Sequence, residues 1–166
     1  LGLVYNATKD PIAAAEKAKK TEAIKNVLPE FQELKDINMK SAMEDVELPF
    51  HLAYDANGNF IGAAVETFTN KGFSGNISLM VGILADGTVN NISVLQHAET
   101  PGLGSKMSEP SFKDQFNNKH ADSFNFNVKK DGGDVDAITA ATISSRAFCD
   151  AVNRAISTFE NNKGGF

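Results

Sequence analysis

The residues best suited to chemistry lie in one hydroxyl-rich stretch, DAITAATISS, which runs from Asp136 to Ser145. Its core, TAAT, places two threonines around two alanines, and an apolar-periodic segment follows directly. A helix that begins here would present unpaired backbone N–H groups and the positive end of its dipole, and both favour anions. The alanines would let a bulky anion approach, and the hydroxyls could donate to phosphate oxygens. The stretch predicts either an anion site or a simple helix N-cap, which Thr and Ser commonly provide.

A nucleophilic hydroxyl is a further interpretation of the same stretch. Such a residue needs a base and an orienting group. The chain has no GxSxG or SxxK motif, and no histidine lies near the stretch in sequence, so a hydrolase is weakly supported. A hydroxyl that another enzyme modifies needs no internal base. It needs exposure, small neighbours and surroundings that tolerate an anion, all of which this stretch could offer.

Two glycine-bearing segments upstream are also candidates for ligand contact. GFSGNI spans Gly72 to Ile77, and its glycines permit close approach of the backbone to another molecule. HAETPGLGSK spans His97 to Lys106 and opens a long polar segment rich in Pro and Gly. Loops of this length in a compact domain are more often functional than idle. The alternative for AETPGLG is a tight Pro-Gly turn.

Composition narrows the classes of protein that fit. A chain of 166 residues favours one domain, and a formal net charge of -5 argues against a surface that binds nucleic acid. The single cysteine, Cys149, excludes an intramolecular disulfide framework and a cysteine-based metal cluster. The histidines His51, His97 and His120 are far apart in sequence, so we predict no metal site.

Local signals predict the elements that position the motif. The N-terminal segment predicts a helix with Asp10 as its cap, Pro11 as its first residue, and its end at Leu28. Two β-hairpins follow, with turns at Asn57-Gly58 and Asp86-Gly87, and the segment NKGFSGN connects them as a loop. SFKDQFNN predicts a short helix, and the alternating SFNFNV predicts a strand.

The C-terminal segment predicts an amphipathic helix, because apolar residues recur every three to four positions from Ile143 to Phe159. Thr142 or Ser144 is the expected N-cap. Cys149 is expected to be a small core or boundary residue rather than a reactive thiol. The opposite, polar face is expected to carry Arg146, Asp150, Asn153 and Arg154. The predicted fold class is α+β, with a mostly antiparallel sheet, an N-terminal helix and a C-terminal helix that starts at the hydroxyl-rich motif.

The three segments together resemble a known family. DAITAATISS looks like the flavinylation motif of the FMN-binding domain family, S/T-G-A-T followed by a hydroxyl residue. HAETPGLGSK is similar to the E-T-P-G-L-G segment of the G subunit of the Rnf electron-transport complex, and the C subunit of the sodium-translocating NADH:quinone reductase is a more distant likeness. GFSGNI resembles the family's G-Y-x-G-P-I. The segments stand in the family's order and, with the connecting hairpins, cover roughly residues 50–160.

The resemblance implies a covalent flavin. In this family FMN is joined by a phosphoester to the last threonine of the motif, which corresponds to Thr142. Backbone N–H groups from Ala141 onward, with the Thr139 and Ser145 hydroxyls, are then expected to hold the phosphate oxygens. Ala140 replaces the family's usual glycine, and because alanine rarely adopts a positive φ, we expect ordinary αR or β backbone there.

The same resemblance assigns flavin contacts to the ETPGLG segment: Glu99, Thr100, Gly102, Leu103, Gly104 and Lys106. The two polar residues at its start could bind the ribityl hydroxyls or a ring edge, and the leucine could pack on the isoalloxazine face. The glycines would allow close approach, and the lysine would offset phosphate charge or favour the anionic reduced flavin.

The implied function is electron transfer by a subunit of a membrane ferredoxin:NAD oxidoreductase coupled to ion transport, rather than a stand-alone enzyme. The implied partners are the other subunits and a flavin transferase that uses FAD. The implied location is the extracytoplasmic (periplasmic) face of the cell membrane, where an N-terminal anchor would hold the domain. The apolar stretch LGLVY, residues 1–5, is either a remnant of this anchor or a short strand. Residues 1–40 would form the N-terminal helix and membrane-proximal segment, and residues 41–166 the FMN-binding domain. The alternatives are a non-redox module that binds a phosphate-bearing ligand or a partner protein without covalent flavin, and, with less support, a domain of a soluble reductase.

Overall fold

The structure is a computed structural model, and it describes residue 15 and residues 17–41 and 45–162. The predicted helix start at Asp10 and Pro11, and the apolar LGLVY stretch, lie outside the described residues. Residues 17–27 are helical, and the helix ends directly before Leu28 and Pro29, close to its predicted end. Among the helices of the described part, none combines the length and apolar character that crossing a membrane requires.

Five strands form one antiparallel sheet in which spatial order follows sequence order. The predicted hairpin turns are confirmed, because Gly58 (φ 79°) and Gly87 (φ 94°) take the left-handed conformations that tight turns need. The strand β1 falls in the segment that sequence analysis assigned to the N-terminal unit, and it pairs along its whole length with β2. The strands are β1 (Glu33–Lys40), β2 (Glu47–Tyr54), β3 (Phe60–Gly72), β4 (Gly75–Leu84) and β5 (Val89–Gln96).

Two predicted elements differ in the structure. The NKGFSGN loop is shorter than expected, because β3 continues to Gly72 and β4 begins at Gly75, which leaves a two-residue turn. The predicted strand SFNFNV is wrong. Phe126 and Val128 are buried as the alternation suggested, but the backbone pairs with residues 133–135 and not with the sheet. Alternation reports which side chains are buried, and it does not specify a backbone partner.

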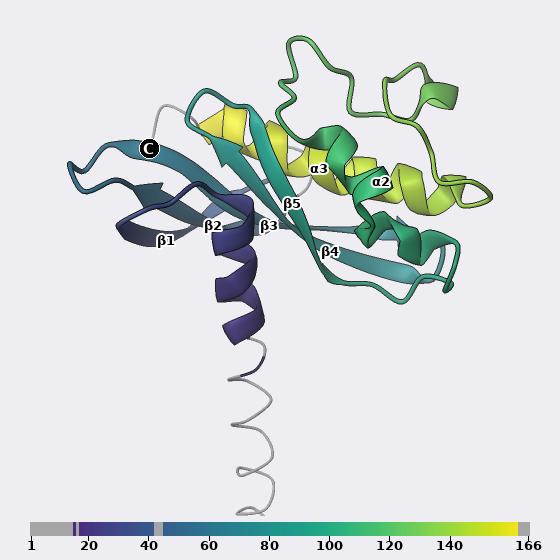
Figure 1. Ribbon diagram of the computed structural model, residues 1–166, viewed down its shortest axis with the longest axis horizontal. Coiled ribbons are helices and arrows are strands. Elements are labelled where there is room, and N and C mark those ends of the chain that lie inside the picture. Colours follow the sequence, from purple (N-terminus) through teal and green to yellow (C-terminus); the bar gives the residue numbers. More distant parts are fainter. Residues whose placement is uncertain (1–14, 16, 42–44, 163–166) are drawn as a thin grey trace, which may run out of the picture.

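Helices cover both faces of the sheet. The helix α3 (Thr142–Asn162) packs against β3 and β4 over the main core, and Figure 1 shows it lying along the sheet while the N-terminal helix projects away from it. This confirms the predicted α+β class and its two flanking helices. The short helices are η1 (Gly104–Ser108), α2 (Pro110–Lys113), η2 (Asp114–Phe116) and η3 (Lys129–Asp131). The predicted short helix corresponds to α2 and η2.

The N-terminal helix packs on a second, smaller apolar cluster. The helix contributes Ala23, Ile24 and Val27, the next residue Leu28 joins them, and the sheet contributes Ala53, Ala64, Met80 and Leu95. Contact is so close at Gly82 that a Cβ there would lie 1.9 Å from the carbonyl oxygen of Val27. A glycine in a central strand therefore sets how near the helix end can lie to the sheet.

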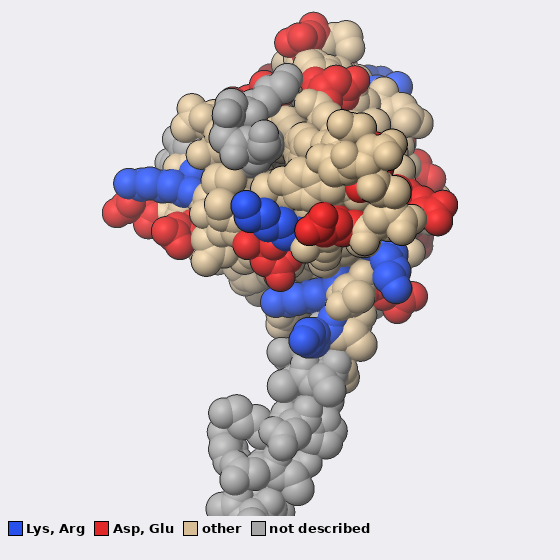
Figure 2. Space-filling model, turned by 90° about the vertical axis from the view of Figure 1, so that its left-hand side faces the viewer, with Lys and Arg blue, Asp and Glu red and all other residues tan. Residues whose placement is uncertain are grey.

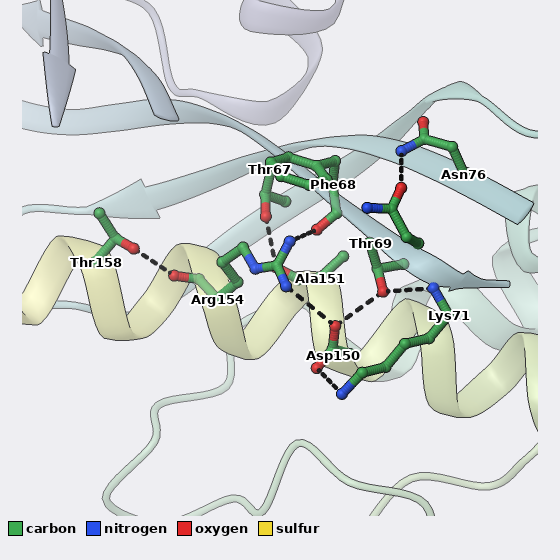
Figure 3. A network of polar contacts seen from close by, with 10 residues as sticks. Thr67, Phe68, Thr69, Lys71, Asn76, Asp150, Ala151, Arg154 and Thr158 are labelled. Carbon is green, nitrogen blue, oxygen red and sulfur yellow. Dashed lines mark hydrogen bonds and ion pairs between the residues drawn. The ribbon is translucent and has the colours of Figure 1, made fainter. Parts of the chain in front are cut away.

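Arg154 is buried, although the helical periodicity placed it on the polar face of α3. Its guanidinium donates to the Phe68 carbonyl at 2.6 Å, lies 4.6 Å from the Phe68 ring centroid and is 3.6 Å from the Asp150 carboxylate. Asp150 also accepts a hydrogen bond from Thr69 at 2.8 Å and lies 3.3 Å from the ammonium of Lys71. Figure 3 shows this network joining α3 to β3. The polar face of α3 thus turns partly toward the sheet, where β3 supplies the partners that buried charges require.

A second charge cluster connects the sheet to the N-terminal helix. His51 lies between two carboxylates, with Nδ1 2.7 Å from Asp36 and Nε2 2.8 Å from Glu66, and Glu66 is 3.0 Å from the ammonium of Lys20. Figure 2 shows acidic and basic side chains lying next to one another on the face that it presents. Burial alone would lower the pKa of His51, but the hydrogen bonds and charges of the two carboxylates outweigh it and raise the pKa above its ordinary value.

The contribution of His51 to stability should therefore disappear in alkaline solution. Because the pKa is raised on folding, the contribution is fully present below the unfolded value of about 6.5 and is lost as pH rises through the folded pKa. We expect His51→Gln to destabilise the protein more at pH 6 than at pH 9, as measured by urea unfolding. In a Glu66→Gln background this difference should shrink, and an unchanged difference would contradict the assignment.

Candidate functional site

The hydroxyl-rich motif forms a turn that leads into α3. The helix begins at Thr142, so the cap position falls on Ala141, and Thr142 and Ser144 both lie in the first turn instead of capping it. Ser145 is buried, and its hydroxyl accepts from the Ile138 N–H at 2.9 Å and donates to the Ala141 carbonyl at 2.9 Å. This hydroxyl, which we expected to hold phosphate, fastens the turn to the helix. These bonds differ from those of an N-cap residue, whose side chain accepts from an N–H group of the first helical turn.

Ala140 has a positive φ of 61°, which contradicts the expectation of ordinary backbone. The Ala141 N–H donates to the Ile138 carbonyl at 3.0 Å and closes a turn with Ala140 in its third position. A type II turn requires positive φ at that position, where glycine is favoured. The turn imposes its geometry on the residue, so the backbone keeps a glycine-like conformation although the glycine is missing.

Ala140→Gly should stabilise the protein by about 0.5–1 kcal/mol. An L-residue in the left-handed region costs the folded protein roughly 1–2 kcal/mol, and glycine removes this strain. Glycine also gives the unfolded chain more conformational freedom, which offsets about 0.4–1 kcal/mol of the stabilisation. The measurement is the free energy of unfolding in urea. Ala141→Gly is the matched control, because its backbone has no positive φ and its methyl group is buried, so it should destabilise. Equal effects from both substitutions would argue against strain at position 140.

A pocket of about 350 Å³ lies beside the motif. Five of the ten predicted site residues line it, namely Thr100, Leu103, Gly104, Ala141 and Thr142. Its other lining residues are Phe73, Ala140, Ile143 and Ser144. The structure therefore brings the three candidate segments, from residues 72–77, 97–106 and 136–145, together around one cavity. A larger pocket of about 460 Å³ borders the N-terminal helix and contains no residue of these segments.

The other five predicted residues do not line the pocket: Glu99, Gly102, Lys106, Thr139 and Ser145. Thr139 is exposed in the turn before the helix, and Lys106 is exposed in η1. Gly102 has a φ of 77°, and a Cβ there would meet no atom within 4 Å, so its conformation rather than close packing favours glycine. At Gly104 a Cβ would lie 2.4 Å from Ser144 Oγ, so here close packing requires glycine.

Glu99 is 5% exposed and is engaged within the protein. Its carboxylate accepts from the N–H groups of Phe73 and Ser74, both at 2.8 Å. It also accepts from the Ser144 hydroxyl at 2.6 Å. Burial raises the pKa of Glu99, but these hydrogen bonds, that from Ser144 first, outweigh burial and hold the pKa below its ordinary value. The carboxylate is therefore ionised at neutral pH.

Sequence reasoning assigned only part of the apolar rim of the pocket. Phe73, Leu103 and Ile143 are 68%, 39% and 49% exposed, and all three line the cavity. Of these only Leu103 was predicted. Large apolar side chains gathered in the open indicate a binding surface. One sequence signal pointed to this rim. Ile143 is the first residue of the apolar periodicity of α3, and it lies at the end of the helix next to the motif.

Cys149 is part of the core and not of the site. It is 2% exposed, and burial raises the pKa of its thiol to about 12. The thiol therefore stays protonated at physiological pH, where the thiolate is the reactive form. Of the two predicted places, core and boundary, the structure shows the core.

The fold and the pocket agree with one class of protein. The family model of the FMN-binding domain matches residues 72–157, just over half of the chain, and this span includes all three segments around the pocket. It runs from the β3–β4 turn through most of α3. The protein is thus built around an FMN-binding domain.

Relatives that match over most of their length make the assignment more specific. The chain is 36% identical to the G subunit of the ion-translocating oxidoreductase complex of Aliivibrio fischeri, over 93% of this chain and 79% of the relative. It is 35% identical to the protein of the same name from Methanosarcina acetivorans, over 99% and 87%. The chain belongs to this family of G subunits within the FMN-binding domain family.

Solved structures share the fold. The C subunit of the Na(+)-translocating NADH-quinone reductase from Parabacteroides distasonis has a TM-score of 0.60 at 19% identity, with 83% of this chain and 79% of that chain covered. NqrC of Shewanella oneidensis has a TM-score of 0.53 at 19% identity, with 87% and 73% covered. At this identity the likeness concerns the fold alone.

Proposed function

We propose that this chain carries FMN joined by a phosphoester to Thr142 Oγ and passes electrons as one relay of an ion-translocating oxidoreductase complex. The observation that carries the proposal is the position of Thr142. It is half-buried in the wall of the pocket, at the first residue of the 21-residue helix α3. The motif, the pocket and the family membership all converge on this hydroxyl.

The phosphate end of the pocket suits an anion. The Ser145 N–H donates to the Ala141 carbonyl. The N–H groups of the residues of α3 before Ser145 have no intrahelical acceptor, because they lie at the start of the helix. These groups and the helix dipole favour a phosphate at Thr142. Ala140 and Ala141 add only methyl groups to this wall, which leaves room for the phosphate oxygens.

The ring end of the pocket suits a flat apolar group. Phe73, Leu103 and Ile143 offer the apolar contact area that an isoalloxazine ring would cover, and the volume of about 350 Å³ falls within the range of small-molecule sites. FMN would supply one- and two-electron redox chemistry, and the protein would position it and tune its potential. Lys106, exposed in η1, remains a candidate for offsetting phosphate charge, and Gly102 for shaping the loop.

Attachment would leave the flavin oxidation state unchanged. Thr142 Oγ loses its proton and forms a bond to phosphorus, while the anhydride bond of FAD breaks and AMP leaves. A flavin transferase would supply the base and FAD, so the absence of a base beside the motif in sequence fits this chemistry. A covalent tether keeps the cofactor in place while electrons pass to and from partner subunits.

Membership in the family of G subunits supports a proposal about the partners and the location of this chain. We propose that the chain works with the other subunits of an Rnf-type complex, which transfers electrons between ferredoxin and NAD and couples this transfer to ion transport. We place the domain on the extracytoplasmic face of the cell membrane, held there by an N-terminal anchor. The alternative is a binding module without covalent flavin, and it depended on Ala140 in place of the family's glycine. The φ of 61° at Ala140 is the conformation that glycine favours, which supports the flavin proposal over this alternative.

Intact mass and in-gel flavin fluorescence test the proposal. Protein coexpressed with a flavin transferase should gain the mass of one FMN minus water, and its fluorescence should persist after denaturation. The same protein made without the transferase is the control and should have the unmodified mass. An unmodified chain in the presence of an active transferase would overturn the proposal.

A further inference from the structure

The Glu99 carboxylate joins three segments that are far apart in sequence. It binds the β3–β4 turn through the N–H groups of Phe73 and Ser74, and it binds the first turn of α3 through the Ser144 hydroxyl. Glu99 itself belongs to the loop after β5. We define these three hydrogen bonds as the Glu99 clamp.

Each segment held by the clamp supplies a wall of the pocket. Phe73 comes from the turn, Leu103 from the loop after β5, and Thr142 from α3. Glu99 does not line the cavity. Its carboxylate therefore acts on the pocket through its hydrogen-bond partners, of which Phe73 and Ser144 line the cavity.

The clamp is built too tightly to be an incidental contact. A Cβ at Gly104 would lie 2.4 Å from Ser144 Oγ and 2.8 Å from Glu99 Cβ, so the backbone of the loop lies directly against the clamp. A buried carboxylate is costly unless donors satisfy it, and three donors at 2.6–2.8 Å do so here. Replacing the carboxylate by an amide would set an NH2 group against one of the two amide N–H groups of the turn and would remove the charge that strengthens the remaining bonds.

We propose that Glu99 is a positioning residue, whose carboxylate holds the three walls of the pocket in the arrangement that accepts the flavin. This inference rests on the proposed function for its ligand, and it departs from the sequence-based expectation that Glu99 contacts the ribityl chain or the ring. The clamp is made of protein groups alone, so its consequences can be measured before any cofactor is attached.

Glu99→Gln is the central variant. The amide keeps the size of the side chain but places a donor where an acceptor is needed. Hydrogen exchange of the Phe73 and Ser74 amides, measured on protein without flavin, should accelerate about tenfold or more, because hydrogen bonds to charged groups are the stronger ones. The rate of flavin attachment by a transferase, followed by intact mass, should fall by about tenfold or more.

Two further variants separate positioning from general stability. Glu66→Gln removes a partly buried carboxylate that is paired with His51 and Lys20, and it should leave both the attachment rate and the two amides unchanged. Ser144→Ala detaches α3 but keeps the bonds to the turn, so attachment should slow while the amides stay protected. This variant tests the clamp even if Glu99→Gln fails to fold.

The clamp is refuted if Glu99→Gln exchanges its turn amides at the wild-type rate, if it takes up flavin at the wild-type rate, or if Glu66→Gln slows attachment equally. A wild-type chain that takes up no flavin would instead defeat the proposed function. In that case the amide exchange, which needs no flavin, still decides whether Glu99 holds the pocket walls.

Discussion

Thr142→Ala should abolish covalent flavin attachment, because it removes the only atom that the proposal allows to bond to the phosphate. Thr142 is half-buried in the pocket wall at the start of α3, and the substitution removes a hydroxyl and a methyl group without touching the core. The fold should therefore persist, with a cost of roughly 1 kcal/mol or less. The measurement is intact mass after coexpression with a flavin transferase, and the expected result is the unmodified chain.

Thr139→Ala is the matched control for this prediction. Thr139 is exposed in the same turn and does not line the pocket, so its loss should leave the adduct in place. Thr142→Ser should also retain an adduct, since the hydroxyl remains. An adduct on Thr142→Ala, or its loss on Thr139→Ala alone, would show that the attachment site is misassigned.

Arg154→Ala should have the largest effect on stability, about 3–5 kcal/mol. Arg154 is 2% exposed and holds the Phe68 carbonyl and the Asp150 carboxylate from within the α3–β3 interface. Its removal takes the donor from the partly buried Phe68 carbonyl, leaves the Asp150 carboxylate with less opposite charge nearby and opens a cavity, and each of these changes destabilises the fold. The free energy of unfolding in urea measures the loss.

Arg146→Ala provides the comparison on the same helix. Arg146 makes two hydrogen bonds of 2.8 Å to Asp131, so its ion pair has better geometry than that of Arg154, but its side chain is 44% exposed. Exposed pairs contribute about 0–1 kcal/mol, so this variant should change stability little. If the two arginines proved equal in effect, burial would not be the deciding factor.

Burial of polar groups is where sequence reasoning reached its limit. Helical periodicity placed Arg154 among the polar residues of α3, and resemblance placed Glu99 against the flavin. Both are buried and are held by partners more than 20 residues away in sequence, namely Phe68 for Arg154 and Phe73 with Ser144 for Glu99. A single sequence shows the charge of a side chain but not the distant donor or acceptor that makes its burial possible.

Local signals, by themselves, determined much of this protein. Asn57-Gly58 and Asp86-Gly87 specified two hairpins because few other residues adopt left-handed turn conformations, and apolar periodicity specified α3. The three glycine- and hydroxyl-rich segments indicated the family and the residues around one pocket, including Thr142.

Only the tertiary structure decided the rest. It showed that residues 123–128 do not join the sheet, that Ala140 takes a positive φ, and that Phe73 and Ile143 border the pocket. These features depend on contacts between segments distant in the chain, and such contacts can override the preferences of individual residues. The sequence therefore located the hydroxyl proposed to hold the flavin, and the packing of the fold determined which residues surround it and which hold those residues in place.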